Sequence, residues 1–133
     1  MANLFSLGVL GLSGLFCLFT SVFSGLQPQA FARQLGLQLT NAGGFNEIRA
    51  QYAGVFLATA ALCGVAILGL APRSFALVVL MVTFGGLLAG RLVSLAINGG
   101  FAGFPPAIIQ LYAIDGTGLV LAGAALFMNA RSA

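Results

Sequence analysis

The third apolar run of the chain, residues 74–97, reads SFALVVLMVTFGGLLAGRLVSLAI, and its only charged residue is Arg91. A run of ~20 apolar residues is long enough for an α-helix to cross the hydrocarbon core of a bilayer. A charge at the centre of such a helix costs ~3 kcal/mol on insertion scales, so it is normally paired and turned toward other helices. This run therefore predicts a membrane-spanning helix that carries a buried ionic site.

Three further apolar runs, residues 4–26, 48–71 and 106–129, fill most of the remaining chain. Of the 133 residues, 60% are hydrophobic and 5% are charged, whereas a soluble domain is ~25% charged. A water-soluble fold of this size could not bury so much apolar surface. We therefore expect residues 1–133 to form one integral membrane domain, an all-α bundle of four transmembrane helices.

Breaker and capping residues mark the ends of these helices. Asn46 is a good N-cap for the second helix, and Glu47 would place a negative charge near its N-terminus. Pro105 and Pro106 precede the fourth run, where a missing backbone N–H costs nothing. Residues 40–44, rich in Gly and Asn, indicate a turn before the second helix.

The longest connection, residues 27–45, also carries a helical pattern. Within it, Phe31, Leu35 and Leu39 recur at helical spacing, and polar residues such as Arg33 lie between them. This pattern is typical of a short helix that lies in the plane of the membrane interface. An irregular loop folded over the bundle is the alternative.

Four charged residues should lie in one leaflet. Glu47 and Arg49 begin the second helix, while Arg91 lies near the end of the third and Asp115 near the start of the fourth. At ~1.5 Å per residue, Arg91 and Asp115 are both ~10–15 Å below the same membrane surface. A bidentate pair with a carboxylate is the natural way to hold an Arg in lipid. We therefore expect Arg91 and Asp115 to meet, with Glu47 and Arg49 near them.

Uncharged polar residues extend this site. Ser94 and Asn98 follow Arg91 at spacings of three and seven residues, which places them on one helical face. Tyr112 precedes Asp115 by three residues and shares its face. The sequence thus predicts a buried ionic cluster or ligand pocket formed by Glu47, Arg49, Tyr52, Arg91, Ser94, Asn98, Tyr112 and Asp115.

Two interpretations of this cluster stay open. It could be a buried clamp that ties the second, third and fourth helices together. It could equally be a polar pocket, open to one side, that binds a small ligand, a lipid head group or a proton. A buried ion pair is weak support for a purely stabilising role, because desolvation offsets the attraction between the charges.

Several kinds of site are excluded or disfavoured by composition. The chain has no His, and its two acids and two thiols lie at unrelated depths, so we expect no metal ion and no cofactor. Cys17 and Cys63 lie inside apolar runs and should pack as small buried side chains. The Phe side chains should be mostly lipid-facing or core. The five Arg are scattered, which argues against nucleic-acid binding. No catalytic motif is present, so an enzyme is disfavoured.

Two motifs resemble a known family. Residues 46–54 read NEIRAQYAG, and residues 90–94 read GRLVS before a Gly-rich break. They resemble the signatures of a family of small bacterial membrane proteins, domain of unknown function 4345. Asp115 would match an acid on that family's fourth helix, where Glu is more usual, and Ala53 stands where Gly is usual. The resemblance implies a four-helix bundle without a known activity, and it covers almost the whole chain.

A second resemblance is weaker. Membrane-bound enzymes that use glutathione are also small four-helix bundles, with a Glu, an Arg and an Ala near the second helix. Their pattern continues with polar residues, whereas residues 55–58 here are apolar, VFLA. This departure argues against that family.

The predicted role is that of a structural or accessory subunit of a larger membrane complex, because a chain that is nearly all bundle would meet partners through its helix sides. Partners would be the lipid bilayer and other membrane proteins, or a second copy. The alternatives are a small transporter, and an enzyme that binds a lipophilic substrate through Arg49, Arg91 and Tyr52. The predicted location is the bacterial inner membrane. Arg73 and Arg131 on the terminal side favour cytoplasmic termini.

Overall fold

The computed structural model describes residues 2–131, which form helices joined by loops and turns and contain no β-strand. The predicted all-α architecture, four long apolar helices with a short helix after the first, is confirmed. The helical segments are α1 (Ala2–Leu26), α2 (Pro28–Gln34), α3 (Ala42–Ile48), the π-helical segment η1 (Arg49–Gly54), α4 (Val55–Ile67), α5 (Arg73–Asn98) and α6 (Pro106–Ala130). Because α3, η1 and α4 run on without a break, they form the second of four stretches that are long and apolar enough to cross a membrane.

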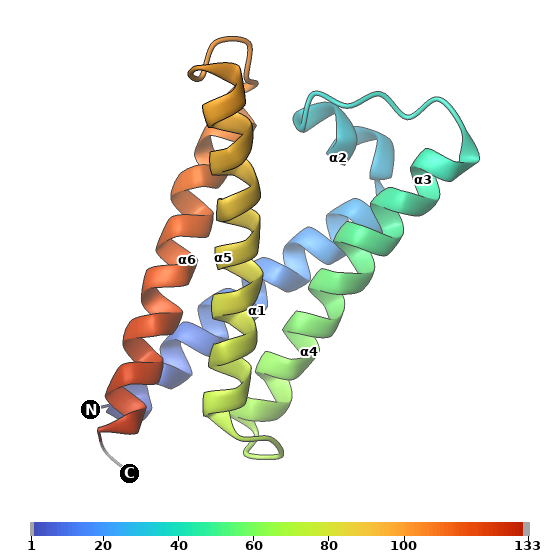
Figure 1. Cartoon of the computed structure of the whole chain (residues 1–133). Coiled ribbons are helices and arrows are strands. Elements are labelled where there is room, and N and C mark those ends of the chain that lie inside the picture. The colour runs from blue at the N-terminus through green and yellow to red at the C-terminus, as the bar shows by residue number, and fades with distance from the viewer. Residues whose placement is uncertain (1, 132–133) are drawn as a thin grey trace.

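The four long helices form two pairs that cross at an angle (Figure 1). α1 packs along α4 and η1, and α5 packs along α6. α1 also contacts α6, and α4 contacts α5. At one end, here called the terminal end, the pairs lie close together beside the α4–α5 turn (Figure 1). At the other end, here called the loop end, they diverge, and α2, α3 and the α5–α6 loop lie there (Figure 1).

The second long helix begins earlier and ends earlier than the sequence suggested. The side chain of Asn41, not Asn46, caps it by accepting a hydrogen bond of 3.0 Å from the backbone N–H of Gly44. The predicted turn over residues 40–44 is therefore wrong from Ala42 onward, because an N-cap that is satisfied at Asn41 lets helix start there. Glu47 consequently lies in the second turn instead of at the N-terminus.

The end of this helix is set by a glycine. Gly69 adopts a left-handed conformation, with φ of 77°. The N–H of Leu70 then bonds the carbonyl of Val65, and the N–H of Gly69 bonds that of Ala66. This pair of bonds is a Schellman motif, which satisfies the last carbonyls and stops the helix. The predicted end at residue 71 is therefore four residues too late.

The interior divides into two clusters. The larger one lies toward the terminal end and draws on all four long helices; its buried members are Val9, Leu10, Cys63, Ala66, Ala76, Leu77, Leu80, Phe84, Ala122 and Ala125. The smaller one lies at the loop end and holds α2 against α1 and α3, through Phe31, Ala32 and Ile48. Cys17 and Cys63 are both free and buried, as expected.

Candidate functional site

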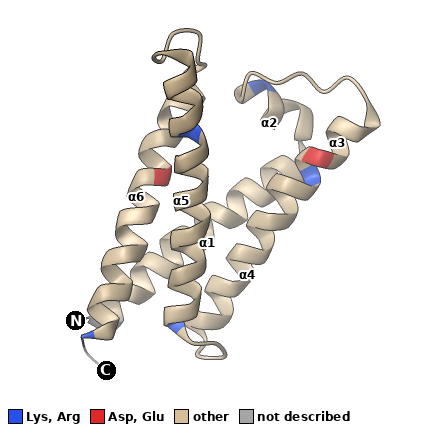
Figure 2. Cartoon of the chain, viewed as in Figure 1, with Lys and Arg blue, Asp and Glu red and all other residues tan. Residues whose placement is uncertain are grey.

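Arg91 on α5 and Asp115 on α6 form an ion pair in the loop-end half of the molecule. The Nε of Arg91 donates to Oδ2 of Asp115 across 2.6 Å. The Asp115 side chain is 2% exposed and that of Arg91 is 18% exposed. The predicted pairing of these two residues is confirmed, and the charge-assisted bond joins the two antiparallel helices at matching depth. Figure 2 shows one positive segment on α5 and one negative segment on α6 in the half of the molecule nearer the α5–α6 loop.

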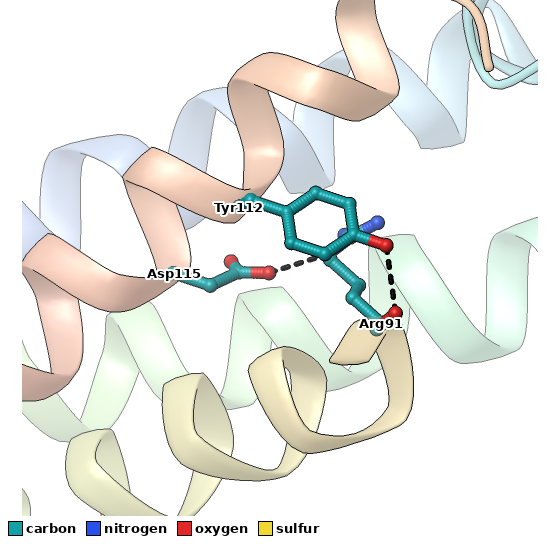
Figure 3. Close-up of polar contacts among 3 residues, drawn as sticks. All are labelled: Arg91, Tyr112 and Asp115. Carbon is teal, nitrogen blue, oxygen red and sulfur yellow. Dashed lines mark hydrogen bonds and ion pairs between the residues drawn. The ribbon is translucent and has the colours of Figure 1, made fainter. Parts of the chain in front are cut away.

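Tyr112 adds a second bond between the same helices. Its hydroxyl donates to the backbone carbonyl of Arg91 at 2.6 Å, and its ring meets Phe101 edge-on with centroids 5.2 Å apart. Figure 3 shows Tyr112 and Asp115 reaching from α6 to opposite parts of the same residue, the carbonyl and the guanidinium of Arg91. The position of Arg91 is thus held at both its main chain and its side chain.

The guanidinium of Arg91 keeps unused hydrogen-bond capacity. A guanidinium has five N–H donors, and only Nε–H is bonded to a residue among those described. Among the side chains of residues 4–131, each buried nitrogen and oxygen has a hydrogen-bond partner, so the unbonded terminal amino groups of Arg91 are not fully buried. They can therefore donate to a bound molecule.

Arg91 also lines a cavity between the two helix pairs. It has a volume of about 270 Å³ and is lined by Arg91 and Asp115 together with residues of α1, α2, η1, α4, α5 and α6. The rest of the α5–α6 wall is mainly aliphatic, with Leu87, Leu111 and Ile114, and Gln110 adds one uncharged amide. The cavity is thus mainly apolar and has one ion pair on one side, which differs from the polar pocket that the sequence suggested.

The opposite wall is aromatic and comes from the other helix pair; its rings belong to Phe16, Phe19, Phe23, Phe31, Tyr52 and Phe56. The rings contact one another in a chain. The centroids of Phe31 and Tyr52 lie 4.9 Å apart, and Tyr52 and Phe56 are parallel within 4° at 6.4 Å. Such contacts stabilise one another beyond their buried area and hold large, flat surfaces toward the cavity.

Tyr52 reaches this wall from the π-helical segment η1. The extra residue in a π turn rotates the following side chains relative to an ordinary α-helix, and such turns are frequent at functional sites. Two bonds fasten η1 to α1: the Ser21 hydroxyl donates to the carbonyl of Ala53 at 2.8 Å, and Arg49 Nε donates to the carbonyl of Gly25 at 3.3 Å. The position of Tyr52 is therefore fixed by contacts to α1 on both sides of it.

The expectation that Glu47 and Arg49 belong to the same buried cluster is wrong. Both side chains are exposed, neither lines the cavity, and they lie on the diverging helix pair, away from Arg91 and Asp115 (Figure 2). The four residues lie at similar depths along their helices, which suggested a cluster. The angle between the two helix pairs nevertheless keeps Glu47 and Arg49 apart from Arg91 and Asp115 at the loop end. Arg49 instead places its positive charge at the C-terminal end of α1, where it complements the helix dipole.

Ser94 and Asn98 also lie outside the cluster. Both are exposed on α5, so the polar stripe that begins at Arg91 turns away from the cavity. Asn98 ends the helix: its side-chain amide donates to the carbonyls of Gly100 at 2.8 Å and Ala102 at 3.0 Å. Of the eight predicted site residues, Tyr112 and Asp115 each bond to Arg91, and Tyr52 shares the cavity with Arg91 and Asp115.

The aromatic wall was not predicted, although a signal for it is present. Phe16, Phe19 and Phe23 follow one another at spacings of three and four residues, and Tyr52 and Phe56 are four residues apart. Such spacings place rings on one face of a helix. Phe side chains in apolar runs are expected to face lipid or the core, whereas these Phe rings line the cavity.

Comparison with protein families gives a match over residues 6–127, to the family described as Domain of unknown function (DUF4345). The chain belongs to this family. Comparisons with curated proteins and with solved structures gave no match. Membership in DUF4345 together with four apolar helices long enough to cross a bilayer identifies a small multi-pass membrane protein. The ion pair, the cavity and the aromatic wall all lie within the matched residues.

Proposed function

We propose that this protein binds a lipophilic small molecule from the bilayer in the cavity between its two helix pairs. The cavity carries the proposal, because it joins an apolar, aromatic wall to a buried pair of charges whose Arg91 has free N–H donors. Binding sites for small molecules are typically apolar clefts with a few convergent polar groups. Intramembrane charges that face such a cleft are expected to contact the ligand.

A cavity-filling variant tests this proposal. Ala107 lines the cavity at the start of α6, so Ala107→Trp places an indole in it. Ala96→Trp, at an exposed position of α5 outside the cavity, adds the same side chain as a control. The three proteins are purified in mild detergent and their retained small molecules are identified by mass spectrometry. We expect one compound to be retained by the wild type and by Ala96→Trp, and to be lost from Ala107→Trp. Equal retention in all three would refute the proposal.

A role as accessory subunit of a larger membrane complex is a second candidate, and one surface favours it. Gly86 and Gly90 lie one turn apart on an exposed face of α5, and a Cβ at either position would meet no atom within 4 Å. Such a face lets another helix approach closely in lipid. Gly86→Leu with Gly90→Leu should then abolish copurification of a partner. A protein that runs as a free monomer before and after the change would exclude this role.

The predicted location, a bacterial inner membrane with cytoplasmic termini, accompanies either role as a proposal. It is supported by the four apolar helices of this chain and by the placement of Arg73 beside the α4–α5 turn at the terminal end.

A further inference from the structure

We infer that the cavity takes a neutral lipophile with a planar ring that carries hydrogen-bond acceptors, of which a short-chain quinone is the simplest representative. This inference rests on the proposed function and names the chemistry of the ligand. Four properties of the site lead to it: its charge, its donors, its aromatic wall and its size.

The charge of the site favours a neutral head group. Among the residues that the structure describes, Arg91 and Asp115 are the only charged ones that line the cavity, and they neutralise each other across 2.6 Å. A ligand carboxylate or phosphate would add a negative charge that no residue of the wall compensates. An uncompensated charge in an apolar, desolvated site is strongly unfavourable. A head group without net charge avoids this cost.

The hydrogen-bond donors of the site favour a ligand that carries hydrogen-bond acceptors. The terminal amino groups of Arg91 offer N–H donors from the α5–α6 wall. The hydroxyl of Tyr52, on the opposite wall, has no hydrogen-bond partner among the residues that the structure describes. A molecule with two carbonyl oxygens at opposite edges of a ring could accept from both walls at once. Carbonyl oxygens accept hydrogen bonds without carrying a full charge.

The aromatic wall and the size of the cavity favour a ring. Tyr52 and Phe56 lie parallel within 4°, and Phe31 packs against Tyr52 with centroids 4.9 Å apart. Flat faces of this kind accommodate a planar ring by offset stacking or edge contacts. A volume of about 270 Å³ lies just below the ~300–1,000 Å³ of sites that enclose drug-sized molecules. The cavity therefore has room for a ring-sized head group, and an attached tail extends outside it.

Binding of three probes with nearly equal tails, of nine carbons in decanoate and ten in the other two, separates the alternatives. Decylubiquinone has a neutral ring with two carbonyls, decanoate has an anionic head, and decanol has a neutral head without a ring. Each is titrated by calorimetry into the full-length protein in detergent micelles, with empty micelles as the blank. We expect saturable binding of decylubiquinone, and binding at least about tenfold weaker for the other two. Decanoate binding as tightly as the quinone, or more tightly, would overturn the inference.

Variants of the cavity residues test whether decylubiquinone binds in the cavity. Tyr52→Phe keeps the ring and removes only the hydroxyl, and Arg91→Leu with Asp115→Leu removes the donors without leaving an unpaired charge. Each should weaken decylubiquinone about tenfold, the loss of roughly one hydrogen bond. Arg49→Leu, outside the cavity, is the control and should bind as the wild type does. Unchanged affinity in both cavity variants would overturn the inference.

The same titrations distinguish failure of this inference from failure of the proposed function. If decylubiquinone does not bind but decanoate or decanol binds and is lost in Ala107→Trp, the cavity binds lipophiles and the neutral-ring chemistry is wrong. If every probe binds Ala107→Trp as it binds the wild type, both proposals fall.

Discussion

The two ends of the helix bundle are built from different side chains. At the terminal end the helices meet through small and aliphatic residues, and Leu10, Leu77 and Leu80 are fully buried. A hydrogen bond of 2.9 Å from the Ser6 hydroxyl to the Asn129 side chain ties α1 to α6 there. At the loop end, the aromatic wall on one helix pair faces the Arg91–Asp115 pair on the other across a cavity. The helices of the two pairs pack directly on one another at the terminal end, whereas at the loop end a cavity lies between them.

The difference shows how side-chain volume sets the angle between helices in lipid. Small residues let backbones approach closely, and packing is the main force that joins helices where there is no water to expel. Gly118 on α6 illustrates this, because a Cβ there would lie 2.7 Å from the ring of Phe84 on α5. Toward the loop end, large rings on α1, η1 and α4 occupy the space between the pairs, and the helices diverge (Figure 1).

The largest effect is expected at the loop end. Asp115→Ala removes the partner of Arg91 and leaves a buried positive charge, which should lower the free energy of unfolding by ~3–5 kcal/mol. Combining Asp115→Ala with Arg91→Leu removes both charges and should restore most of that stability. Unfolding by sodium dodecyl sulfate in mixed micelles measures both. If the double variant is as unstable as the single one, the pair is not the source of the loss.

The next largest effect tests the packed end against the open one. Leu80→Ala opens a hole in a fully buried position and should cost at least ~2 kcal/mol in the same assay. Leu111→Ala, on the cavity wall, should cost clearly less, because a side chain that borders open space has fewer atoms to lose contact with. Equal losses would mean that the cavity is filled by protein in the bilayer and that the two ends do not differ.

The smallest effect concerns the close approach of α5 and α6. Gly118→Ala would press its Cβ against the Phe84 ring and should cost ~1–3 kcal/mol. Gly86→Ala is the matched control on the exposed face of α5, where a Cβ meets no atom within 4 Å, and it should change stability by less than ~0.5 kcal/mol. The thermal unfolding midpoint in detergent is sensitive enough to separate them. Indistinguishable midpoints would contradict the close packing.

Much of the architecture follows from local sequence. The lengths of the apolar runs give the number of long helices. Gly69 and Gly99 follow the ends of α4 and α5, and Pro106 begins α6. These helix ends follow from local sequence because helix caps depend on neighbouring residues only. The Arg91–Asp115 pair was also predictable. Both residues lie at countable distances from helix ends on one surface, and a lone charge in hydrocarbon is too costly to leave unpaired.

What only the tertiary structure decided is which residues at equal depth meet. Glu47 and Arg49 lie near the loop end, as Arg91 does, yet the divergence of the helix pairs and the earlier start at Asn41 leave both of them exposed. The cavity has the same origin, since Tyr52 and Arg91 line it together, and Tyr52 lies in a π turn that residue periodicity does not reveal. Depth along a helix is a local quantity that residue counting supplies. The rotation of a helix and its angle to its neighbours arise from the summed packing of side chains on several helices, which no single stretch of sequence contains.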